Sequence, residues 1–111
     1  MIINKVELPD IDLEDLETVE KFEKAINDMQ VAEEKIKTST KLSDVIKSNC
    51  IAIFDFFNTL FGEGTDKKIF GDKTNLRICM DAYDELMSQL EKKKSNILKS
   101  INKYSNARAR R

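Results

Sequence analysis

The sequence has no histidine, and its 111 residues include only two cysteines. Without histidine, the most common general acid–base group near neutral pH and the most common metal ligand are both missing. Cys50 and Cys79 are too few for a zinc cluster or a disulfide framework, and their apolar neighbours predict buried free thiols. Serine and cysteine nucleophiles have no visible base except lysine. We therefore expect a protein that is not an enzyme and that uses no cofactor and no metal.

Long apolar runs are also missing. No stretch approaches the ~20 apolar residues of a membrane-spanning helix, and no signal peptide opens the chain. We therefore expect a cytoplasmic protein with no membrane partner. Charged residues make up 35% and apolar residues 41%, a balance that is common in long amphipathic helices. The length suits a single domain with one modest core.

The net charge of −1 hides a strong asymmetry along the chain. Residues 7–34 contain eleven acidic residues against Lys21 and Lys24, whereas residues 92–111 contain eight basic residues and no acidic one. Such an asymmetry can belong to an interaction tail or can match the helix dipoles, and both interpretations stay open.

Glycine and proline are scarce, and their positions mark the connections. Pro9 is the only proline, and it ends a short strand or extended arm predicted in residues 1–11. If this segment is a strand, it pairs with a neighbouring copy or with residues 11–13. All three glycines lie within residues 50–71, and we interpret them as a structural loop rather than a phosphate loop, because no strand precedes them. The predicted loop residues are Gly62, Gly64, Thr65 and Gly71.

Apolar residues at three- and four-residue spacing predict an all-α domain with three long helices and one short connector helix. The long helices are expected at residues 12–37, 42–61 and 74–104, and the short one at residues 66–70, with Asp12 and Thr65 as caps. Residues 105–111 would form a basic tail. The second helix is apolar nearly all round, which indicates a central position. The predicted structural core comprises Phe54, Phe57, Leu60, Phe61 and Phe70.

Short connections favour antiparallel neighbours, which predicts an up–down–up bundle. The third long helix, at about 45 Å, exceeds the ~30 Å of the second, so its end should protrude. Apolar residues on a protruding helix indicate a contact with another protein. We expect self-association or docking through this end and the exposed side of the first helix. The candidate protein-binding residues are Ile97, Leu98, Ile101 and Tyr104.

The alternative is a small regulatory protein that contacts nucleic acid through its basic end, although the net-acidic chain argues against such a partner. This alternative predicts a steep salt dependence of DNA binding. A carboxylate metal site at Asp81 and Glu85 is a weaker interpretation than a solvated acidic face. The candidate nucleic-acid-binding residues are Lys99, Lys103, Arg108, Arg110 and Arg111.

Four segments resemble a family of small proteins from tailed bacteriophages and prophages. They are VEKFEKA at residues 19–25, IFDFFNTLFGEGTDKKIFG at 53–71, NLRICMDAYDEL at 75–86 and INKYSNARARR at 101–111. This N-terminus, with Pro9, is less regular than the hairpin-like start of such proteins. The resemblance covers nearly the whole chain and implies a morphogenesis protein like the tail assembly chaperones. Such a protein would bind a tape-measure or tail-tube protein in the cytoplasm of the bacterial host.

Overall fold

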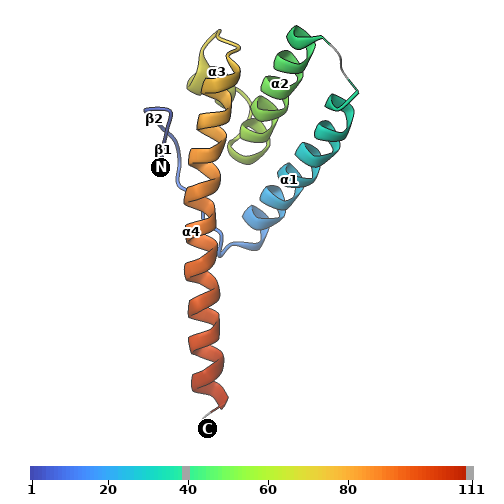
Figure 1. Cartoon of the computed structure of the whole chain (residues 1–111). Helices are drawn as coiled ribbons and strands as arrows, with labels where there is room; N and C mark the ends of the chain where they lie inside the picture. The colour runs from blue at the N-terminus through green and yellow to red at the C-terminus, as the bar shows by residue number, and fades with distance from the viewer. Residues whose placement is uncertain (39–40, 110–111) are drawn as a thin grey trace.

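The central helix, α2 (Leu42–Phe61), packs against every other helix of the fold (Figure 1). The computed structural model describes residues 1–38 and 41–109 of the chain. In this part, α1 (Leu16–Ile36) and α4 (Leu76–Ala109) are the other long helices, and α3 (Thr65–Phe70) is the short connector. The strands β1 (Ile2–Ile3) and β2 (Val6–Glu7) form a small hairpin. The predicted all-α class with three long helices and one short helix is confirmed.

The core is built from aromatic side chains of α2. Phe57, Leu60 and Phe70 are buried as predicted, whereas Phe54 and Phe61 are half-buried at the edge of the cluster. Periodicity did not select Phe56, yet this side chain is only 2% exposed. Its ring makes edge contacts with aromatic rings of α1 and α4, so it joins the three long helices at one point: the partners are Phe22, at 6.4 Å between centroids, and Tyr83, at 5.1 Å.

Two helix starts differ from the prediction. Helix α1 begins at Leu16 and not near Asp12, because Asp15 is the residue that caps it and accepts a hydrogen bond from the Thr18 N–H at 3.2 Å. The Asp12 carboxylate instead accepts from the Glu14 N–H in the preceding turn. Helix α3 begins at Thr65, with Gly64 before it, and the Thr65 hydroxyl donates back to the Gly62 carbonyl at 2.6 Å.

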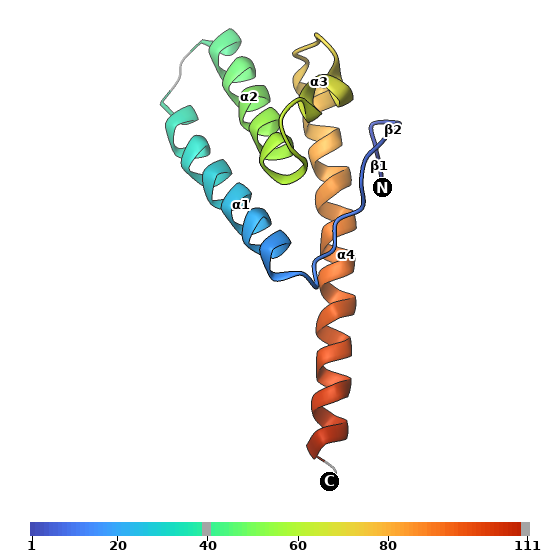
Figure 2. The same cartoon turned by 180° about the vertical axis from the view of Figure 1, so that it is seen from behind.

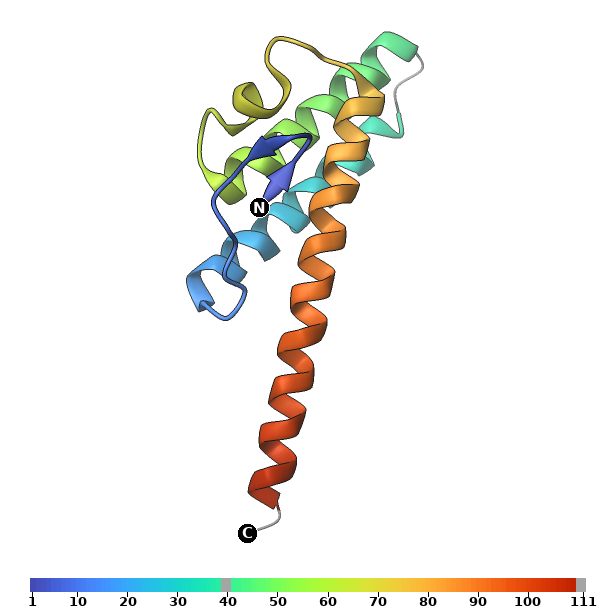
Figure 3. The same cartoon turned by 90° about the vertical axis from the view of Figure 1, so that its left-hand side faces the viewer.

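The third long helix runs in the opposite sense to the prediction. Tyr83 of α4 contacts Phe56 of α2, and both helices run from the top of the view downwards in Figure 1, so α2 and α4 are parallel where they touch. The bundle is therefore up–down–down and not up–down–up (Figure 1). The connection is the reason, because the segment 62–75 contains α3 and carries the chain back to the end where α2 begins (Figure 3).

The N-terminal segment is part of the core. Ile2 pairs with Glu7 and Ile3 with Val6, so the two strands pair with each other, and residues 11–13, one of the two predicted partners, are not the partner. Its turn has positive φ at both central residues, 51° at Asn4 and 64° at Lys5, which matches the right-handed twist of a tight hairpin. The side chains that this segment buries are Ile3, Leu8 and Ile11.

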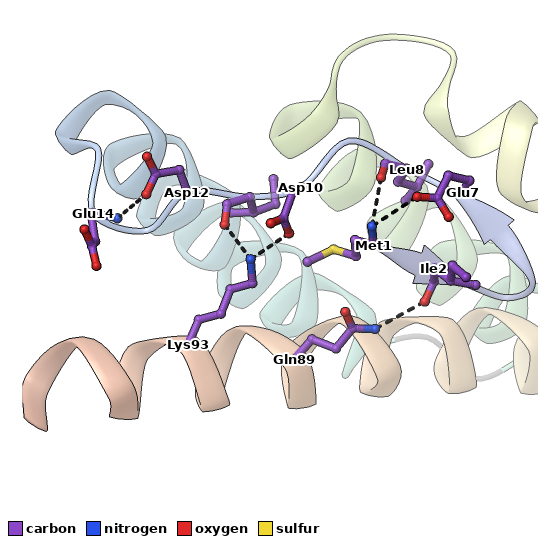
Figure 4. Close-up of polar contacts among 10 residues, drawn as sticks. Met1, Ile2, Glu7, Leu8, Asp10, Asp12, Glu14, Gln89 and Lys93 are labelled. Carbon is purple, nitrogen blue, oxygen red and sulfur yellow. Dashed lines mark hydrogen bonds and ion pairs between the residues drawn. The ribbon is translucent and has the colours of Figure 1, made fainter.

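Polar contacts from α4 hold the N-terminal segment in place (Figure 4). The Lys93 ammonium group donates to the Asp10 carboxylate at 2.6 Å and to the Ile11 carbonyl at 2.9 Å. This hydrogen bond lowers the pKa of Asp10 below its ordinary value. One helical turn earlier, the Gln89 amide donates to the Ile2 carbonyl at 3.2 Å. The segment therefore follows α4 over several turns.

Cys50 and Cys79 are buried free thiols, as predicted. Burial, and then the interaction with Cys50, raises the pKa of Cys79 from 9.0 to about 12. We expect neither thiol of the native protein to react with a disulfide reagent at pH 8, and both to react once a denaturant unfolds the chain. Rapid labelling of the native protein would contradict this arrangement.

The same thiol predicts a loss of stability at high pH. In the unfolded chain Cys79 ionises near 9.0, whereas in the folded chain it keeps its proton until about 12. Ionisation therefore stabilises the unfolded chain as the pH rises from 9 towards 12, and the free energy of unfolding falls. Urea titrations at pH 8 and pH 10.5 measure this fall. We expect a smaller fall in a Cys79→Ala variant, since that variant lacks the thiol that ionises only in the unfolded chain.

Candidate functional site

Helix α4 extends well past the other helices (Figures 1 and 2). Leu90 is the last side chain of α4 that is buried, at 1% exposure. Beyond it, Ile97 is half-buried, and the other three predicted protein-binding residues are 51–65% exposed: Leu98, Ile101 and Tyr104. The helix also continues through the predicted tail as far as Ala109, because no glycine or proline interrupts it. We call residues 97–109 the overhang.

An apolar groove lies between the start of α1 and the middle of α4. Its volume is about 360 Å³, and its lining is mostly apolar. Leu13, Phe22 and Ile26 form one wall, and Met87, Ile97 and Leu98 form the other. Helix α1 lies nearest to α4 at its N-terminal end and diverges from it towards its C-terminal end (Figure 2), which leaves the groove open between the two walls.

A second hollow continues this groove along the overhang. It has a volume of about 470 Å³, and Leu13 and Ile97 line both hollows. Ile101 and Tyr104 extend the lining towards the C-terminal end of α4. The two hollows therefore form one continuous surface, which we call the apolar strip and define by six residues: Leu13, Phe22, Ile97, Leu98, Ile101 and Tyr104. Sequence periodicity found the α4 side of this strip, but Leu13 precedes α1 and had no helical pattern to mark it.

The candidate nucleic-acid-binding residues do not share one face. Lys99 and Lys103 lie one turn apart on the side of the overhang away from Ile97 and Tyr104. The Arg108 guanidinium instead lies over the Tyr104 ring, at 5.5 Å from its centroid, as a cation–π pair. Arg110 and Arg111 lie outside the described residues. The basic side chains are therefore divided between two sides of the helix.

The acidic face at Asp81 and Glu85 is engaged in surface contacts. Asp81 forms a long ion pair with Arg77 at 3.9 Å, and Glu85 accepts a hydrogen bond from the Asn4 N–H at 3.4 Å. Within residues 1–38 and 41–109, no group of three or more potential metal-ligating side chains lies close enough together to hold an ion.

The glycine loop has a structural explanation. Gly62, Gly64 and Gly71 all have positive φ, at 113°, 90° and 62°, which side-chain-bearing residues rarely adopt. The Asn58 side chain accepts a hydrogen bond from the Asp66 N–H at 3.0 Å, so an α2 residue occupies the start of α3. This contact and the buried Thr65 support a connector that places α4 beside α2.

Comparison with known proteins identifies a family and no individual relative. A family model described as a family of unknown function (DUF6673) matches residues 4–111. No curated protein and no solved structure matches the chain. Among the helices of the described residues, none combines the length and apolar content that crossing a membrane requires.

Proposed function

The chain belongs to the DUF6673 family of unknown function, and we propose that it is a non-enzymatic, protein-binding module of phage or prophage morphogenesis. Its role would be like that of a tail assembly chaperone, and its partner a tape-measure or tail-tube protein. The observation that carries the binding part is the exposed apolar strip at the overhang. The phage part of the proposal rests on the resemblance of residues 53–71 and 101–111 to small proteins of tailed bacteriophages and prophages.

The strip has the features of a helix-binding groove. Its two walls offer apolar side chains at helical spacing, which is how amphipathic helices are commonly bound. Tyr104 is 65% exposed, and tyrosine is one of the residue types that dominate binding energies at interfaces. Burial of apolar surface contributes roughly 25 cal/mol per Å², so covering this strip favours association.

A binding experiment with named proteins tests this proposal. The purified chain is mixed separately with the tape-measure and tail-tube proteins of the phage or prophage genome that encodes it, and complexes are measured by gel filtration and calorimetry. We expect one of the two proteins to bind. Ile101→Glu should weaken that binding by about tenfold or more, a loss of at least 1.4 kcal/mol, because it places a charge in the apolar strip.

Asn106→Glu is the matched control. This residue lies about two and a half turns after Ile97, on the opposite side of the overhang, so the same added charge should leave binding unchanged. Absence of binding to both tail proteins would contradict the proposal. Tight DNA binding with a steep salt dependence would instead favour the nucleic-acid alternative.

A further inference from the structure

We propose that the apolar strip is occupied by the overhang of a second copy of this chain, in an antiparallel, two-fold symmetric dimer. This goes beyond the proposed function, since it requires no tail protein, and a tail protein that binds the same strip would have to displace the second copy. Each copy would insert its own overhang and receive that of its partner, so that the same surface is used on both copies.

The overhang carries apolar side chains that an apolar surface can bind. Ile97, Ile101 and Tyr104 follow three- and four-residue spacing, so they lie along one side of a helix. The strip is an extended apolar surface along two hollows. The groove has a volume of about 360 Å³, and the hollow that continues it has a volume of about 470 Å³. An overhang cannot occupy the strip of its own chain, because α4 is one continuous helix from Leu76 to Ala109. A second copy is then the nearest source of a matching helix.

Charge determines the orientation. Residues 92–111 contain eight basic residues and no acidic one, so the two overhangs offer each other no opposite charge in either orientation. The start of α1 has the opposite character, with Glu14, Glu17, Glu20 and Glu23 all exposed. An antiparallel arrangement brings the basic end of each overhang to the acidic α1 wall of its partner. A parallel arrangement would leave the basic end far from these carboxylates, so only the antiparallel arrangement pairs it with opposite charge.

The register of the two copies follows from the same residues. With a two-fold axis near Ile101, Tyr104 of one copy lies opposite Leu98 of the other, and Arg108 lies opposite Lys94. Glu23 and Glu91 line the groove together with Lys94, so two carboxylates are available to the incoming guanidinium. Arg108 is therefore expected to form ion pairs across the interface and to keep its contact with Tyr104.

Light scattering on the purified chain tests the dimer. We expect a mass of twice 12.8 kDa for the wild-type protein at micromolar concentration and a shift towards 12.8 kDa on dilution. Ile101→Glu should raise the dissociation constant by about tenfold or more, and Asn106→Glu should leave it unchanged. A wild-type mass that stays at 12.8 kDa up to millimolar concentration would overturn the proposal, as would a stable assembly larger than two copies.

A charge exchange tests the orientation. Arg108→Glu and Glu23→Lys should each weaken the dimer, and the variant that carries both changes should recover much of the lost affinity. A parallel dimer places Arg108 beside Arg108 of the other copy and far from Glu23, so Glu23→Lys would then leave the affinity unchanged, and that result would overturn the antiparallel arrangement. Failure of the double variant to recover affinity would overturn the proposed pairing. Lys47→Glu, an exposed charge reversal on α2, is the control that should have no effect.

These measurements use the chain alone, so they are independent of tail-protein binding. A strict monomer that binds a tail protein would refute the dimer and support the proposed function. A dimer that binds neither tail protein would support the dimer and refute the proposed function. Circular dichroism of each variant separates the loss of an interface from the loss of the fold.

Discussion

Replacing Phe57 by alanine is expected to lower the free energy of unfolding by about 3–5 kcal/mol. The side chain is 0% exposed and packs among three other phenylalanine rings, so its removal would leave a cavity that the rigid surroundings fill only in part. Native domains are typically stable by only about 5–15 kcal/mol, so this loss would be a large share of the total stability. The neighbouring rings are Phe56, Phe61 and Phe70, at centroid distances of 6.5, 6.2 and 5.8 Å.

Urea and thermal unfolding measure this effect, and Ile51→Ala on the same helix is its control. Ile51 is 43% exposed, so its truncation should change the free energy of unfolding by about 1 kcal/mol or less. Phe57→Leu should lie between the two, because leucine fills part of the cavity. A Phe57→Ala protein that melts like the wild type would show that α2 is not the centre of the core.

Replacing Ile3 by alanine is expected to lower the free energy of unfolding by about 2–5 kcal/mol. This is a large effect for a residue near the chain end, where truncation usually costs little. It is expected because Ile3 is 0% exposed within the shared hydrophobic core, and an isolated two-stranded hairpin would not be stable on its own. Packing and hydrogen bonds both attach the hairpin, since Gln89 donates to Ile2 and the Asn4 side chain donates to Ile69.

The adjacent Ile2 provides the matched control, because it is chemically identical and 56% exposed. Ile2→Ala should change the free energy of unfolding by only a few tenths of a kcal/mol. Denaturant titrations of the two variants therefore compare the two faces of one short strand. Equal effects from the two substitutions would contradict the position of the hairpin in the core.

Local patterns in the sequence predicted the helices well. The bounds of α2, Leu42–Phe61, match the prediction, since Gly62 ends the helix with a positive φ. Helix α4 begins close to the predicted start at residue 74, and Asn75 accepts a hydrogen bond from the Ile78 N–H there. Asp12 and Asp15 were harder to distinguish, because both are good cap residues and only the path of the preceding chain decides between them.

Contacts between distant segments were not predicted. Phe56 lies on the side of α2 that faces α1 and α4, and periodicity alone does not tell how many neighbours a nearly all-apolar helix has. Ile51 shows the converse, because it lies in a helix predicted to be apolar nearly all round and yet remains exposed. The buried Ile3 was missed because a two-residue strand has no period to detect.

The sequence by itself determined the all-α class, the bounds of its central helix, the glycines of its connector and the protruding end of its last helix. These are local properties that depend on propensity, capping, spacing and length. Only the tertiary structure decided that α4 runs parallel to α2, that the N-terminal hairpin completes the core and that Leu13 joins the overhang in one apolar strip. The physical reason is that these features depend on the path of the chain between helices, and packing energy between residues distant in the sequence decides that path.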